Sequence, residues 1–137
     1  MGADLSTSLR VSAAGMDVQT SRLRVIAENL ANQNTTGPGP GAEAYRRRTI
    51  SFENRMDRAL GAETVRVKKI GRDKAEQPLR YEPGNPAADK NGYVKVPNVN
   101  SFVELMDMRD AEQSYSANLN VAAATRTMLN KTLDLLK

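Results

Sequence analysis

Neither glycine nor proline occurs in residues 98–137, which read NVNSFVELMDMRDAEQSYSANLNVAAATRTMLNKTLDLLK. These residues are nearly as rare at the other end of the chain, where no proline precedes Pro38 and only Gly2 and Gly15 interrupt residues 1–36. Both residue types destabilise the interior of a helix, so their absence favours a long helix at each end of the chain.

The predicted helices cover residues 4–32 and 100–136. Aspartate, serine and asparagine are good N-terminal caps, and they stand at the expected starts as Asp4, Ser6, Asn100 and Ser101. With a rise of 1.5 Å per residue the helices would be about 40 and 55 Å long. A globular domain of this size is only about 30 Å across. We therefore expect both helices to extend beyond any core formed by the middle of the chain.

Each predicted helix carries a line of apolar residues at seven-residue spacing. In the first helix the line is Leu9, Met16, Leu23 and Leu30, with Ile26 beside it. In the last helix it is Met108, Tyr115, Ala122, Leu129 and Leu136, with Leu105, Leu119 and Leu133 in companion positions. One narrow apolar line is typical of a coiled-coil seam. We predict that these residues form an assembly seam, although periodicity alone leaves open whether the partner helix belongs to the same chain or to another.

The middle of the chain is predicted to be a small β module. All six prolines and the remaining glycines lie between Gly37 and Pro97. Short strands are expected at residues 47–53, 64–70, 79–82 and 93–96, as a hairpin or a small barrel, and residues 54–60 are ambiguous. The predicted fold is mainly α, with terminal helices paired as a coiled-coil-like hairpin and short strands between them. The corresponding division is residues 1–36, 37–97 and 98–137.

The composition excludes several kinds of active site. The chain of 137 residues contains no cysteine and no histidine, which removes thiol catalysis, Ser-His-Asp triads and the commonest zinc ligands. Asp107, Asp110 and Glu112 lie on different faces of the predicted helix, so we expect no metal site and no cofactor. A small lyase or hydrolase would need a clustered carboxylate–lysine site, and it remains an alternative.

The positive charge is concentrated in one segment. Residues 45–80 carry eleven basic and five acidic side chains, while the whole chain has a net charge of +4. The run Arg46, Arg47 and Arg48 is the densest part of this excess. It is predicted to be either a solvated strand face or a charge patch between subunits. A nucleic-acid-binding protein is the other alternative, although aromatic residues for base stacking are scarce.

The end of the first predicted helix carries a recognisable motif. Residues 25–35 read VIAENLANQNT and resemble the N-terminal signature of bacterial flagellar rod and hook proteins. The motif residues are Asn29, Leu30, Ala31, Asn32 and Thr35. The segments YEPGN at 81–85, GYVKVPNVN at 92–100 and MLNKTL at 128–133 resemble the proximal-rod type of that family. Residues 36–44 are an insertion relative to most other members, which also fits the proximal-rod type.

The resemblance implies a structural, non-enzymatic subunit of the flagellar basal body. In that family the terminal helices form the wall of a helical tube that transmits torque to the hook, and the middle module lies outside them. The implied partners are other copies of the chain, the rod proteins FlgB, FlgF and FlgG, and the rod–ring adaptor FliE. Nucleic acid and direct membrane insertion are not implied.

The resemblance also implies export by the flagellar type III apparatus into a rod that spans the periplasm. The first sixteen residues, MGADLSTSLRVSAAGM, lack a basic region followed by a continuous apolar run. We therefore expect no cleaved secretory signal. Export through a dedicated apparatus explains how a protein without such a signal leaves the cytoplasm.

Overall fold

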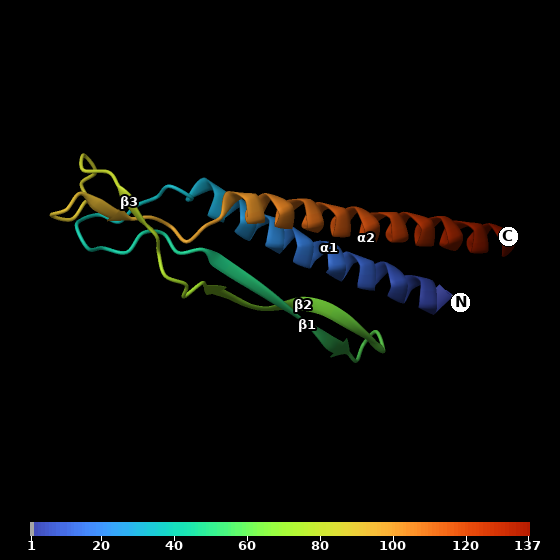
Figure 1. The fold of residues 1–137 in the computed structure, drawn as a ribbon. Helices are drawn as coiled ribbons and strands as arrows, with labels where there is room; N and C mark the ends of the chain where they lie inside the picture. The colour runs from blue at the N-terminus through green and yellow to red at the C-terminus, as the bar shows by residue number, and fades with distance from the viewer. Residues whose placement is uncertain (1) are drawn as a thin grey trace. The chain divides into compact units, whose positions relative to one another are not determined.

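Two long helices dominate the computed structural model, which describes residues 2–137 (Figure 1). The first helix, α1, spans Gly2–Ala31, and the second, α2, spans Ser101–Leu135. Both predicted helices are therefore confirmed, with ends close to the expected positions.

Polar side chains form hydrogen bonds at the C-terminal end of α1 and at the N-terminal end of α2. At the start of α2, the Asn100 carboxamide oxygen accepts the N–H groups of Phe102 and Val103 at 3.1 and 3.4 Å. This is the expected N-terminal cap, because these amides have no partner within the helix. At the end of α1, the Asn32 side chain donates to the carbonyl of Glu28 at 2.8 Å.

The strands form two separate two-stranded sheets within the described residues. β1 (Arg48–Asp57) pairs with β2 (Ala62–Arg72), and β3 (Leu79–Tyr81) pairs with β4 (Tyr93–Lys95). The second pair is antiparallel, with Arg80 opposite Val94. The predicted strands are confirmed as hairpins, and no small barrel is formed by residues 2–137.

The ambiguous residues 54–60 are divided between the end of β1 and the following turn. One carboxylate oxygen of Asp57 accepts the backbone N–H groups of Ala59 and Leu60 at 2.9 and 3.3 Å. Gly61 then adopts a φ of 68°, which a residue with a side chain rarely adopts. Local turn chemistry therefore ends the strand, although the hydrophobic pattern alone gave no clear boundary.

Contacts within the chain divide it into two compact units. The helix–hairpin unit contains the residues up to Leu23, Ser51–Lys69 and Met108–Lys137. The loop–sheet unit contains Arg24–Ile50 and Ile70–Asp107. Each long helix contributes one part to each unit.

In the helix–hairpin unit, α1 and α2 pair through small and polar residues. The hydroxyls of Ser8 and Thr125 are 3.4 Å apart, and Arg22 forms an ion pair with Asp110 at 2.9 Å. Between them, Gly15 is buried against the side chain of Asn118. Residues later in α1 therefore contact residues earlier in α2, so the two helices are antiparallel.

The close approach of the helices at Gly15 gives a testable prediction. An added Cβ atom would lie 2.8 Å from the amide group of Asn118. In an unpacked helix, Gly→Ala stabilises by about 1 kcal/mol, but overpacking typically costs about 1–3 kcal/mol. We therefore expect Gly15→Ala to lower the free energy of unfolding, as measured by urea denaturation followed by circular dichroism.

The matched control shortens the neighbouring side chain. In an Asn118→Ala background the added methyl group has room, so we expect Gly15→Ala to stabilise the protein there by about 1 kcal/mol. The same stabilisation in both backgrounds would show that the helices do not approach closely at this position.

The loop–sheet unit has a small core centred on Val94 and Val96, which are both buried. Gln77 is also buried, and its side chain holds the preceding loop in place. Its amide oxygen accepts the N–H of Ala44 at 3.1 Å, and its amide nitrogen donates to the carbonyls of Ala44 and Tyr45 at 2.9 and 3.2 Å. One side chain thus satisfies three backbone groups that would otherwise lack partners.

Candidate functional site: a buried polar network and apolar helix faces

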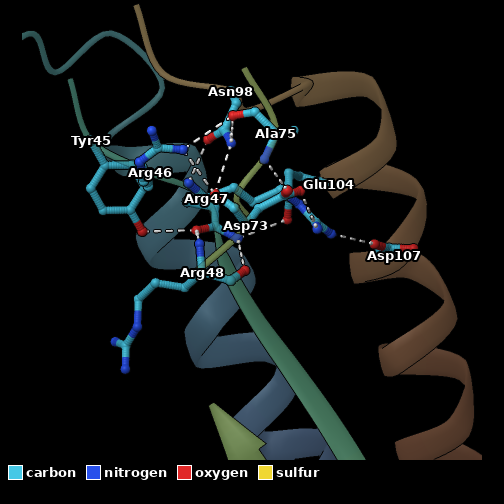
Figure 2. A network of polar contacts seen from close by, with 10 residues as sticks. Tyr45, Arg46, Arg47, Arg48, Asp73, Ala75, Asn98, Glu104 and Asp107 are labelled. Atoms are coloured by element: carbon cyan, nitrogen blue, oxygen red, sulfur yellow. Dashed lines mark hydrogen bonds and ion pairs between the residues drawn. The ribbon is translucent and has the colours of Figure 1, made fainter. Parts of the chain in front are cut away.

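A polar network in the loop–sheet unit includes Tyr45, Arg47 and Glu104 (Figure 2). Asn29 belongs to the same network. Its carboxamide oxygen accepts the backbone N–H of Arg48 and the hydroxyl of Tyr45, both at 2.8 Å. Its amide nitrogen donates to the carbonyl of Arg48 at 2.9 Å and to the carboxylate of Glu104 at 3.3 Å. Only 1% of Asn29 is exposed. An amide supplies donors and an acceptor together, which an aspartate in this position would not.

Glu104 brings a charge into the same network. Its side chain is 1% exposed, and it accepts a hydrogen bond of 2.5 Å from the guanidinium of Arg47. Arg47 also lies 3.7 Å from each of the carboxylates of Asp73 and Asp107 (Figure 2). Partial burial lowers the pKa of Arg47, but its hydrogen bond to Glu104 and these carboxylates raise it above the ordinary value. The guanidinium therefore stays charged and compensates the buried carboxylate.

Tyr45 closes the network on its other side. Its hydroxyl donates to Asn29, and the guanidinium of Arg72 lies 5.3 Å from the centre of its ring. Burial raises the pKa of Tyr45 above its ordinary value. The hydroxyl is therefore protonated at neutral pH and can act as the donor that Asn29 needs.

The three arginines of the predicted charge patch each have partners inside the loop–sheet unit. Arg46 pairs with Glu43 at 2.7 Å and donates to the backbone carbonyls of Asp73 and Ala75. Arg48 pairs with Glu28, and Arg47 belongs to the network around Glu104. A contact of these arginines with another subunit stays a prediction.

The network holds three parts of the chain in place. Its polar groups bond to one another, and together they fix the end of α1, the segment before β1 and the start of α2. Within residues 2–137, no three acidic side chains converge in a way that could hold a metal ion. Its chemistry is that of a buried, satisfied ion pair with surrounding hydrogen bonds.

The predicted seam residues differ in exposure. In the helix–hairpin unit, Leu9, Met16, Leu23, Met108, Tyr115, Ala122 and Leu129 are half-buried, while Leu119, Leu133 and Leu136 are exposed. In the loop–sheet unit, Ile26 is buried, Leu30 is half-buried and Leu105 is exposed. The most buried helix positions of the helix–hairpin unit are instead small or polar, namely Ser12, Gly15, Ala111 and Thr125, together with Val18. The intramolecular pair therefore leaves much of the leucine line uncovered.

A hollow of about 640 Å³ lies beside this helix pair. It is lined by Leu9 of α1 and by Leu119, Ala122, Ala123 and Arg126 of α2, among others. Three predicted seam residues, from both helices, thus meet at one concave surface. An apolar side chain from another helix would fit such a surface as a knob fits a hole.

Comparisons with known proteins agree with this geometry. Residues 9–38 match the family model described as "Flagella basal body rod protein", and residues 90–135 match "Flagellar basal body rod FlgEFG protein C-terminal". The flagellar basal-body rod protein FlgC of Agrobacterium fabrum is 49% identical over 97% of this chain and 96% of its own length. Its counterpart in Salmonella typhimurium is 39% identical, covering 91% of this chain and 92% of its own length.

The chain belongs to the FlgC family of flagellar basal-body rod proteins. A FlgC of Bacillus subtilis, 34% identical over 93% of this chain and 95% of its own length, shows the same relation in a more distant relative. Membership identifies a structural protein of the basal body and not an enzyme. In residues 2–137 no helix is long and apolar enough to cross a membrane.

The family motif contributes unequally to the structure of this FlgC-family chain. Asn29 is buried in the network, and Leu30 and Asn32 are half-buried. Ala31 and Thr35 are exposed, and the hydroxyl of Thr35 donates to the Asn32 side chain at 3.1 Å. Asn29 is therefore the motif residue with the clearest role in folding.

Sequence reasoning missed two features of this FlgC-family protein. Glu104 carried no signal, because a lone glutamate in an amphipathic helix is normally solvated. The second feature is an exposed line on α2 formed by Val121, Met128 and Leu135, with the exposed Ala117 and Ala124 four residues before Val121 and Met128. A search of every seven-residue phase of this helix would have found this line.

Proposed function

We propose that this FlgC-family chain is a structural subunit of the proximal rod, in which the apolar lines of its helices bind neighbouring subunits. One observation supports this most directly. The helices already pair with each other through Ser8, Gly15, Asn118 and Thr125. Leu119, Met128 and Leu133 therefore remain at least half exposed. The intramolecular alternative would use the same apolar lines to build the core of a single chain.

The energetics favour covering these lines by other molecules. Burial of one leucine or methionine side chain contributes roughly 1.5–3 kcal/mol, while association costs about 4–15 kcal/mol in lost freedom of motion. A stable contact therefore needs several such side chains at once. Leu119 and Leu133 on one side of α2, and Met128 and Leu135 on another, are each at least half exposed. Two apolar lines on one helix allow each subunit to contact more than one neighbour.

The proposed mechanism is mechanical. In a helical tube the terminal segments 1–36 and 98–137 would form the wall, and residues 37–97 would lie outside it. Torque would pass to the hook through many close-packed helix contacts, because well-packed interiors are stiff and deform little. Catalysis and switching between states have no part in this role.

The proposed partners are other copies of the chain, the rod proteins FlgB, FlgF and FlgG, and the adaptor FliE. We further propose export through the flagellar type III apparatus to a rod that spans the periplasm. The small and polar residues between α1 and α2 support export in an unfolded form. They bury little apolar area, so separating the helices costs less than separating a leucine-lined pair.

Deletion of the gene in its own bacterium tests this role. We expect loss of hook and filament while the membrane ring is retained, because a missing proximal rod subunit stops assembly above the ring. Electron microscopy of isolated basal bodies measures this, and expression of the intact chain from a plasmid should restore the hook. Complete hooks in the deletion strain would contradict the proposed function.

A further inference from the structure

The end of the β1–β2 hairpin in the helix–hairpin unit carries a cluster of three arginines. Arg55, Arg58 and Arg66 line a hollow of about 690 Å³ together with Met56, Asp57 and Thr64. Arg55 and Arg58 are exposed, and the side chain of Arg66 is 48% exposed. A hollow lined by several guanidinium groups is suited to bind carboxylates, because each guanidinium can donate two parallel hydrogen bonds.

Nearby acidic groups only partly neutralise this cluster. Glu53 pairs with Arg66 at 2.5 Å, and one oxygen of Asp57 is engaged by the turn amides of Ala59 and Leu60. Within residues 2–137, neither Arg55 nor Arg58 has an acidic partner. Each of these two arginines therefore has free hydrogen-bonding capacity in the isolated chain.

Another part of the hairpin lies beside α1. A small hollow is lined by residues of α1 and β2, namely Ala14, Asp17, Val18, Ser21, Val65, Arg66 and Val67. Arg66 lines both this hollow and the one at the hairpin end, whereas Arg55 and Arg58 line only the latter of the two. Arg55 and Arg58 are therefore available at the hairpin end, away from the hollow beside α1.

We infer that the hairpin end at Arg55, Arg58 and Arg66 is a docking surface for an acidic segment of a different protein. A second copy of this chain is a poor match, because each copy carries a net charge of +4. Nucleic acid also fits less well, because no aromatic side chain lines the hollow and two carboxylates stand beside it. Charge complementarity therefore selects a protein segment rich in glutamate or aspartate.

Binding of a defined acidic peptide tests this proposal on the full-length, unassembled chain. The probe is a fluorescent ten-residue oligoglutamate, and the readout is its anisotropy at low and at raised salt. We expect binding that weakens as salt is raised. We expect the double variant Arg55→Glu/Arg58→Glu to bind roughly tenfold or more weakly, because it loses two charge-assisted contacts.

The control variant changes the same number of charges elsewhere in the helix–hairpin unit. Arg109 and Lys131 are exposed on α2, and Arg109→Glu/Lys131→Glu should retain binding close to that of the unaltered chain. Circular dichroism of both variants checks that the helices are intact. Equal loss in the two variants would overturn the proposal, because it would show a response to net charge alone.

Two further outcomes would also overturn the proposal. One is absence of oligoglutamate binding at low salt. The other is duplex DNA binding as tightly as the peptide and being lost with Arg55→Glu/Arg58→Glu, which would identify a nucleic-acid site. The hairpin surface is separate from the leucine line of α2, and the measurement uses unassembled protein. Failure here would therefore leave the proposed rod contacts untouched.

Discussion

Leu119→Asp is expected to abolish rod assembly without unfolding the chain. Leu119 is 50% exposed and lines the hollow beside the helix pair, so its replacement removes little packing within the molecule. In an assembled rod the same position would be covered, and an aspartate there would be a buried charge without a partner. Such a charge costs several kcal/mol. Motility and electron microscopy of basal bodies measure assembly, and circular dichroism of the purified variant measures folding.

The matched control places the same charge on the next residue of the helix. Asn120 is exposed and is rotated by about 100° from Leu119, so Asn120→Asp should leave assembly intact. Leu23→Asp and Leu129→Asp should also block assembly, although both leucines are half-buried and some loss of stability is expected as well. Normal rods in the Leu119→Asp strain would show that this line does not contact another subunit.

Arg47→Met is expected to lower the free energy of unfolding by about 3 kcal/mol or more. The substitution keeps much of the side-chain volume but leaves the carboxylate of Glu104, which is 1% exposed, without its guanidinium partner. A buried charge that loses its partner is far more costly than a broken surface pair. Urea denaturation of the full chain, followed by circular dichroism, measures the change.

Two further variants separate this effect from a general loss of charge. Arg46→Met breaks a pair with Glu43, whose side chain is 61% exposed. The carbonyls of Asp73 and Ala75 that Arg46 also bonds keep Asn98 as a donor, so this variant should be destabilised far less than Arg47→Met. In Arg47→Met/Glu104→Met no charge is left buried, so much of the stability should return. A double variant as unstable as Arg47→Met alone would contradict the assigned pairing.

The position of the network gives the family motif a physical meaning. Asn29 bonds at once to the backbone of Arg48, the hydroxyl of Tyr45 and the carboxylate of Glu104. These groups belong to three separate stretches of the chain. By joining them, Asn29 holds the segment before β1 against the ends of α1 and α2 within the loop–sheet unit. Asn29 of the motif therefore contributes to the fold of this unit.

The β segments show which structural features a hydrophobic pattern predicts and which it does not. The alternating run around Val65 and Val67 predicted β2 correctly, because alternation reflects one covered face of a strand. The end of β1 was ambiguous, since it is set by the Asp57 side chain bonding to turn amides and by Gly61 with positive φ. Such single-residue geometry leaves only a weak trace in a hydrophobic pattern.

The arginine run illustrates a different difficulty. The sequence placed Arg46, Arg47 and Arg48 together and offered a solvated face or a subunit contact. The structure gives each arginine its own partner within one unit, and only Arg47 reaches a buried carboxylate. Adjacent residues on an extended segment point in different directions. A run of like charges therefore need not act as a single patch.

The sequence alone determined both helices and the family. Helix formation depends on nearby residues, and the ends of this chain lack glycine and proline almost entirely, while the motif at 25–35 is contiguous. Only the tertiary structure decided which seven-residue line lies between the helices. Residues seven apart lie on the same side of a helix wherever the count starts. The seven-residue spacing alone therefore cannot tell whether the line of Ser8 and Gly15 or the line of Leu9 and Met16 faces the other helix. Close contact between α1 and α2 selects the small residues, while larger ones such as Leu119, Met128 and Leu133 stay exposed.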